Sequence, residues 1–145
     1  MLVLDYHLNK MAIANIKERD LASVDLESLR YYLFPGDIVM KDEEVDFSTQ
    51  WGWVPVLDFA LCLNSIAETL GQGRLEVFEF TESDATLEFR LQGGSALVSS
   101  NYAPGLLCVA PMEFRESAQG LLRRTIKGLC DENPSLAKNS AIRMV

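Results

Sequence analysis

The sequence holds little of the chemistry that most metal-binding or catalytic sites require. It has one histidine, His7, and three cysteines, Cys62, Cys108 and Cys130, which are widely separated. Zinc sites usually take closely spaced pairs of cysteine or histidine ligands, so this spacing argues against zinc. No cysteine lies in a nucleophile signature with a histidine partner. The odd number of cysteines in apolar segments instead predicts buried, reduced thiols, as is typical of a cytoplasmic protein.

Long apolar runs and phosphate-binding loops are also missing. The longest apolar run, residues 53–63, is interrupted by Asp58 and is too short to span a bilayer. The N-terminus carries Asp5 within its apolar stretch and no basic residue before it, which is unlike a signal peptide. Glycines occur singly or in pairs, without a GxGxxG or P-loop motif. We therefore expect a cytoplasmic protein without a cofactor or a membrane partner.

Positive charge is scarce and unevenly distributed. The chain has 21 acidic and 13 basic residues, for a net charge of −8. Residues 1–112 hold 17 acidic and 7 basic residues, a net of −10, whereas residues 113–145 carry a net of +2. Because nucleic-acid binding depends on basic side chains, this balance argues against a nucleic-acid ligand. The acidic surface suits a basic protein partner, or it only keeps the protein in solution.

Apolar spacing predicts a long helix over Trp51–Leu70. Val56, Phe59, Ala60, Leu63, Ala67 and Leu70 recur at three- and four-residue steps, with Asp58 on the opposite side. Pro55 suits the first turn of such a helix, and two glycines follow its end. A second amphipathic helix is predicted over residues 112–130, with Phe114, Ala118, Leu121, Leu122, Thr125 and Leu129 as its apolar stripe.

The remaining segments predict mainly strands. Alternation of apolar and polar residues indicates an antiparallel meander over residues 75–80, 85–91, 95–101 and 106–110. Upstream we expect a strand at 1–8, a short helix from Leu26 to about Leu33 capped by Ser23 or Asp25, a turn at Phe34–Asp37, and a β-hairpin over residues 38–47. Residues 9–20 are compatible with an extension of the first strand or with a polar turn.

These elements predict one domain over residues 1–145 with an α+β fold. We expect a mostly antiparallel sheet of about six or seven strands, with two main helices packed on one face. The tail, residues 134–145, is expected to be loose or to form one short turn.

Two acidic groups lie near the predicted hairpins. The first contains Asp37, Asp42, Glu43, Glu44 and Asp46; the second contains Glu76, Glu79, Glu82, Asp84 and Glu88. Paired carboxylates can perform acid–base catalysis or bind a divalent ion. At turn tips, however, carboxylates are solvated, and the calcium-loop spacing is absent. A small enzyme that uses a carboxylate cluster is therefore one alternative, and we expect no enzyme activity.

Two further features suggest contacts with other chains. Trp51 and Trp53 precede the long helix, so either one is exposed as an interface anchor or both close the hydrophobic core. The strand at 95–101 is more polar than its neighbours, which suggests a sheet edge. An unpaired edge would allow a small homodimeric assembly module, which is a second alternative.

The segment DIVMKDEEVDFSTQWGWVPVLDFALCLNSIAETL resembles a pattern in small bacterial α+β proteins of uncharacterised function. There, a short hairpin leads into a helix that begins with a "PVLDFA"-like stretch. In size, acidity and layout, residues 37–131 are also similar to immunity proteins that accompany bacterial polymorphic and contact-dependent growth-inhibition toxins. The resemblance implies a cytoplasmic protein that binds and blocks one cognate toxin domain. It carries over no functional residues.

The resulting hypothesis is a non-enzymatic inhibitor of a basic toxin domain. Toxin domains that attack RNA or DNA need basic clefts, and an acidic surface would speed encounter with them. The predicted contact residues are Asp42, Glu43, Glu44, Asp46 and Trp51, followed by Glu82 and Asp84. Reversing the charges of residues 42–44 should slow association and leave the fold intact, because residues at turn tips contribute little packing.

Overall fold

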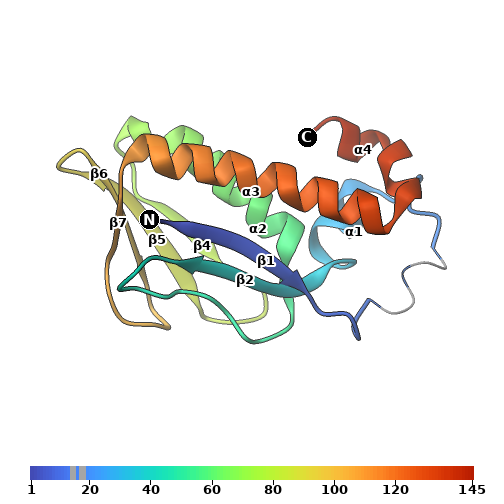
Figure 1. Ribbon diagram of the computed structural model, residues 1–145, viewed down its shortest axis with the longest axis horizontal. Coiled ribbons are helices and arrows are strands. Elements are labelled where there is room, and N and C mark those ends of the chain that lie inside the picture. The colour runs from blue at the N-terminus through green and yellow to red at the C-terminus, as the bar shows by residue number, and fades with distance from the viewer. Residues whose placement is uncertain (14–15, 17–18) are drawn as a thin grey trace.

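A computed structural model describes residues 1–13, 16 and 19–145. Its elements, in chain order, are β1 (Val3–Leu8), α1 (Leu26–Tyr31), β2 (Pro35–Lys41), β3 (Val54–Pro55), α2 (Val56–Thr69), η2 (Leu70–Gln72), β4 (Glu76–Glu79), β5 (Thr86–Gln92), β6 (Ser95–Ser100), β7 (Leu107–Val109), α3 (Pro111–Glu132), η3 (Pro134–Lys138) and α4 (Ser140–Arg143). Figure 1 shows the two long helices, α2 and α3, on the same side of the strands.

The strands of the described residues form two antiparallel sheets, with orders β1-β2-β3 and β4-β5-β6-β7. The α+β class and the antiparallel meander are confirmed, but the single sheet of six or seven strands is wrong. β1 pairs along its whole length with β2 and not with the meander. The first sheet ends at β3, because this two-residue strand continues directly into α2. In the second sheet β6 lies between β5 and β7, so the prediction that it forms an edge is also wrong.

The turn predicted at Phe34–Asp37 is wrong because Pro35 and Gly36 belong to β2. A Cβ atom on Gly36 would lie 1.9 Å from the carbonyl oxygen of His7 in β1. Gly36 is therefore required by the close approach of two strands, which is the other common role of glycine in a sheet. The hairpin itself is confirmed: Phe47 N–H bonds to the Met40 carbonyl, and Thr49 N–H bonds to the Ile38 carbonyl.

Helix α2 begins at Val56, five residues later than predicted. Pro55 lies at the position before the first helical residue, with an extended backbone. The predicted apolar face is confirmed at Phe59, Ala60 and Leu63, which are at most 1% exposed. The prediction that Asp58 lies on the polar side of the helix is wrong, since this residue is only 4% exposed.

Aromatic contacts join the long helices to the second sheet. The Phe59 ring of α2 lies 5.2 Å from Phe78 of β4, and Phe114 of α3 stacks at 5.7 Å from Phe89 of β5. The main core contains residues of both sheets and both helices. A smaller hydrophobic cluster joins α1 to the rest of the fold, because its Leu29 packs with residues of α2, α3 and the tail.

The C-terminal tail is ordered by packing, and the expectation that it is loose or forms only one short turn is wrong. Residues 134–145 form η3 and α4, with Leu136 and Ile142 buried in the smaller cluster. The Asn139 side chain donates hydrogen bonds of 2.7 Å to the carbonyls of Leu21 and Val24. These bonds connect the tail to a segment more than one hundred residues earlier.

Other expectations have mixed outcomes. Helix α1 is confirmed, with Asp25 as its cap, since its carboxylate accepts from Ser28 N–H. All three cysteines are free, but Cys108 is exposed, so its predicted burial is wrong. The alternatives for residues 9–20 fall partly on residues 14–15 and 17–18, which lie outside the described residues. Within the part that is described, no helix is both long and apolar enough to cross a membrane.

Candidate functional site

An exposed tryptophan in the segment before β3 lies on a cluster of aromatic rings. We call Trp51, Trp53, Phe80 and Tyr102 the aromatic cluster. Trp51 is 36% exposed and stacks on Trp53 with ring centres 5.1 Å apart. It also packs edge to face with Phe80 and with Tyr102, with ring centres 5.2 Å apart in each pair. One face of this ring system is therefore supported by aromatic neighbours while the Trp51 side chain remains accessible to a partner.

The backbone of Trp51 is fixed by Asp37 of β2. Carboxylate atom Oδ1 of Asp37 accepts hydrogen bonds from Thr49 Oγ1 at 2.6 Å, from Trp51 N–H at 2.7 Å and from Gly52 N–H at 3.0 Å. Gly52 has a φ of +79°, which favours glycine, and its carbonyl accepts from the Asn9 side chain. Asp37, which the sequence groups with the first acidic cluster, therefore positions Trp51.

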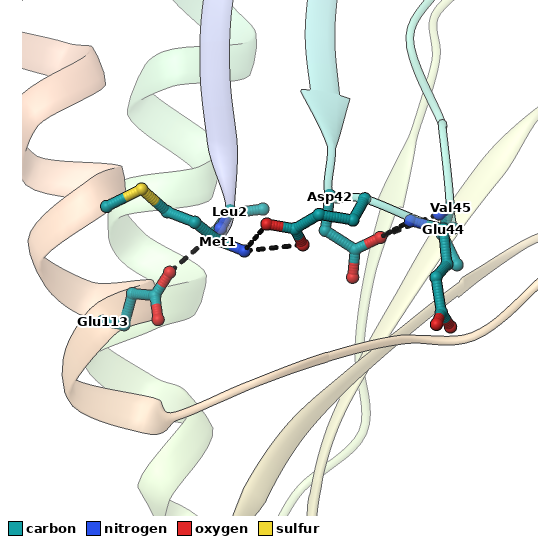
Figure 2. A network of polar contacts seen from close by, with 7 residues as sticks. Met1, Leu2, Asp42, Glu44, Val45 and Glu113 are labelled. Atoms are coloured by element: carbon teal, nitrogen blue, oxygen red, sulfur yellow. Dashed lines mark hydrogen bonds and ion pairs between the residues drawn. The ribbon is translucent and has the colours of Figure 1, made fainter.

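The first acidic turn, residues 42–46, follows β2 (Figure 2). Asp42 Oδ1 accepts from the N–H groups of Glu44 at 2.8 Å and Val45 at 2.7 Å. Glu43 forms an ion pair with the Met1 amine. Asp46 accepts from Ser48 N–H at 2.9 Å. In Figure 2 the Glu44 carboxylate points away from this network.

The adjacent strand end is tied to helix α3. Leu2 N–H donates a 3.0 Å hydrogen bond to Glu113, which lies in the first turn of α3, as Figure 2 shows. The first acidic turn therefore lies beside a contact between the chain start and α3. Both Met1 and Glu43 are largely exposed, so their ion pair contributes little to stability.

The second acidic turn, residues 81–84, joins β4 to β5. It begins directly after Phe80 of the aromatic cluster. Asn101 holds it, since its side chain donates to the Asp84 carbonyl at 2.7 Å and accepts from Thr86 N–H at 2.8 Å. Glu82 has a φ of +65°, a backbone conformation that side chains rarely adopt. Among the described residues, the side chains of Glu82 and Asp84 form no hydrogen bond or ion pair.

The predicted contact residues therefore fall into two groups. Trp51 lies beside the second acidic turn through Phe80. The first acidic turn lies farther along β2: Asp46 pairs with Lys41, while Trp51 bonds to Asp37. At about 3.3 Å per strand residue, these positions are roughly 13 Å apart. A standard interface of about 800 Å² per partner is wide enough to include both groups.

The carboxylates of the first turn are unsuited to acid catalysis. Backbone N–H bonds lower the pKa of Asp42, and the Met1 amine lowers the pKa of Glu43. A bond from Ser48 lowers the pKa of Asp46. A general acid needs a raised carboxyl pKa. Among the described residues, no group of three or more metal-binding side chains is placed to hold an ion.

Sequence reasoning missed a polar cluster between α1 and α2. Arg30 Nε donates to the buried Asp58 carboxylate at 2.5 Å, and Arg30 Nη2 lies 3.1 Å from the Cys62 sulfur. Burial and the Asp58 charge raise the pKa of the Cys62 thiol, so the thiol is protonated and a poor nucleophile. Asp58 interrupting an apolar run was the available signal, but its partner, 28 residues earlier, could not be identified from spacing.

Comparisons with protein-family models, with curated proteins and with solved structures found no match. Function is therefore inferred from the site geometry and the residue chemistry.

Proposed function

We propose that this protein is a non-enzymatic, cytoplasmic immunity protein that binds and neutralises a basic bacterial toxin domain. The observation that carries the proposal is the exposed Trp51 ring, braced by the aromatic cluster beside the second acidic turn. Interfaces take most of their binding energy from a few such anchors, with tryptophan among the most frequent.

The rigidity of Trp51 supports this role. Its backbone is held by Asp37, and its ring contacts three aromatic neighbours. Burial of this ring by a partner costs little conformational entropy, because the Trp51 side chain is already held in place before binding. The same ring is more exposed than is usual for a residue that only closes a core.

Charge supports a basic partner. The carboxylates of Glu82 and Asp84, which bond to none of the described residues, lie in the turn next to Trp51, and the first acidic turn adds negative charge farther along β2. Opposite charge accelerates association and rejects acidic competitors. The contact set is Trp51, Glu82 and Asp84 at the centre, with Asp42, Glu43, Glu44 and Asp46 acting through longer-range attraction.

The two alternatives have lost the features that motivated them. The strand chosen as a dimer edge, β6, is internal to its sheet. The carboxylates considered for catalysis are exposed or half-exposed, at turns or along strands.

A growth-rescue experiment tests the proposal. The reading frame directly preceding this gene is expressed in a bacterium with and without this protein. We expect growth arrest alone, rescue on co-expression, and a purified one-to-one complex. If the preceding product is harmless, or if arrest persists although this protein is folded and abundant, the proposed function is wrong.

A further inference from the structure

Strand β4 presents a free backbone edge. It is the terminal strand of the order β4-β5-β6-β7. The hydrogen bond from Phe80 N–H to the Ala85 carbonyl shows which residues face β5. Because alternate residues of an antiparallel strand bond to its neighbour, Phe78 also faces β5, whereas Val77 and Glu79 direct their N–H and C=O groups outward. Among the described residues, neither backbone has a further hydrogen bond.

A groove of about 430 Å³ runs between this edge and helix α2. Its walls include Cys62, Ser65 and Ile66 of α2 and Val77 to Glu79 of β4, together with the paired Arg30 and Asp58. Val77 is 43% exposed although it is apolar. A free strand edge beside a helix is the arrangement into which an extended peptide can insert as an added strand.

We propose that β4 and this groove bind an extended segment of a partner protein in which basic and apolar residues alternate. The segment pairs with the outward backbone groups of Val77 and Glu79. Because side chains alternate along a strand, one set lies in the groove beside Ile66 and Phe78, which favours apolar residues. The other set lies on the outer face near Glu79 and near Glu88, which pairs with Val77, and this favours lysine or arginine.

Charge argues against a second copy of this chain as the occupant. β4 and the turn after it carry Glu76, Glu79 and Glu82 within seven residues. Two such strands paired edge to edge would place glutamates close to glutamates, which is destabilising. A basic segment turns the same residues into favourable cross-strand pairs.

This inference goes beyond the proposed function because it concerns another surface and does not require a toxin. Strand β4 leads directly into the second acidic turn, so a partner that contacts Trp51 can also extend along this edge. The test below uses a defined peptide, and its failure leaves the growth-rescue experiment unaffected.

The probe is a capped peptide, Lys-Val-Lys-Val-Lys-Val-Lys, titrated into the full-length protein and followed by amide NMR. A peptide of the same composition in block order, with four lysines before three valines, is the control. We expect the alternating peptide to shift the Val77 and Glu79 amide signals and to slow their hydrogen exchange. It should bind about tenfold more tightly than the block peptide.

Two variants and one control distinguish strand pairing in the groove from charge attraction alone. Val77→Pro removes an outward N–H, which an edge strand tolerates, and should weaken binding about tenfold. Ser65→Trp fills the groove and should weaken binding similarly, whereas Glu68→Trp, which does not line this groove, should not. Ser65→Trp decides the matter if Val77→Pro does not fold.

Three results would overturn the proposal. The first is equal binding of the two peptides. The second is parental affinity in a folded variant whose groove is filled. The third is protection of the Val77 and Glu79 amides that rises with the concentration of the protein alone, because this would identify a second copy as the occupant.

Discussion

The two acidic turns carry similar charge but use it differently. In the first, Asp42, Glu43 and Asp46 are all engaged, with backbone N–H groups or with the Met1 amine. In the second, the Glu82 and Asp84 side chains make no such contact among the described residues, and the turn is held by Asn101. Carboxylates that satisfy backbone groups stabilise their own loop. Free carboxylates beside an exposed Trp51 are available to a partner at no cost to the fold.

The largest expected effect follows from removing the anchor beside the second turn. Trp51→Ala should weaken binding of the proposed toxin partner by about 2 kcal/mol or more, about 30-fold, because an interface centre depends on such rings. The affinity of Trp51→Phe for the same partner should lie between those of Trp51→Ala and the parent. Calorimetric titration gives the affinities, with Met112→Ala as an exposed control. If Trp51→Ala bound the partner as tightly as the parent, the aromatic cluster would not be part of the binding surface.

Asp42→Ala should destabilise the first turn. It removes the acceptor of two N–H groups, so the free energy of unfolding should fall by about 0.5–1 kcal/mol. The charge-matched Glu44→Ala should have almost no effect, because that carboxylate points away from the network. Urea unfolding measures both. Within a reversal of residues 42–44, we therefore expect the change at Asp42 to account for most of any loss of stability.

Glu82→Gly should stabilise the protein, in contrast to Asp42→Ala. Glycine adopts the φ of +65° without strain, so the free energy of unfolding should rise by about 0.5–1 kcal/mol despite the extra freedom of the unfolded chain. Thermal unfolding compares this variant with Ser83→Gly. A loss of stability would show that the Glu82 side chain supports the second turn as the carboxylates of the first turn support theirs.

Acid should affect the first turn in particular. In the folded state, backbone N–H groups lower the pKa of Asp42, and the side chain and backbone N–H of Ser48 lower the pKa of Asp46. Their stabilisation is therefore present above the unfolded pKa of about 4. It is lost as pH falls through the lower, folded values. Below about pH 4, hydrogen exchange followed by NMR should show the Val45 and Ser48 amides losing protection relative to their intrinsic exchange rates. The Ala85 amide, which bonds to the Ser83 hydroxyl, should not follow the same titration.

Local sequence pattern predicted the elements better than their assembly. Alternation placed β5 correctly, and helical spacing placed the apolar face of α3, because both depend on neighbours within a few residues. The division into two sheets depends on the pairing of β1 with β2. These segments are distant in sequence, and no local pattern specifies their pairing. Gly36 was misread because a glycine at a close strand approach and a glycine in a turn look alike in sequence.

The candidate site could be predicted only in part. Trp51 and the acidic residues stand out by composition, and Trp51 is exposed as one interpretation required. The bonds that distinguish Asp42 from Glu82 are set by backbone geometry that residue type does not encode. The Asp58 partner and the free edge of β4 require the tertiary arrangement, so they could not be found from spacing.

The most direct test is the association rate of two charge-matched double variants with the proposed toxin partner, measured by stopped flow at low and high salt. Glu82→Lys with Asp84→Lys should slow association about tenfold and reduce its salt dependence, because these charges lie at the contact. Glu43→Lys with Glu44→Lys should slow it less than about threefold, since those charges act from a distance. A larger effect at the first turn, or none at either, would contradict the assignment of the partner surface to Trp51 and the second acidic turn.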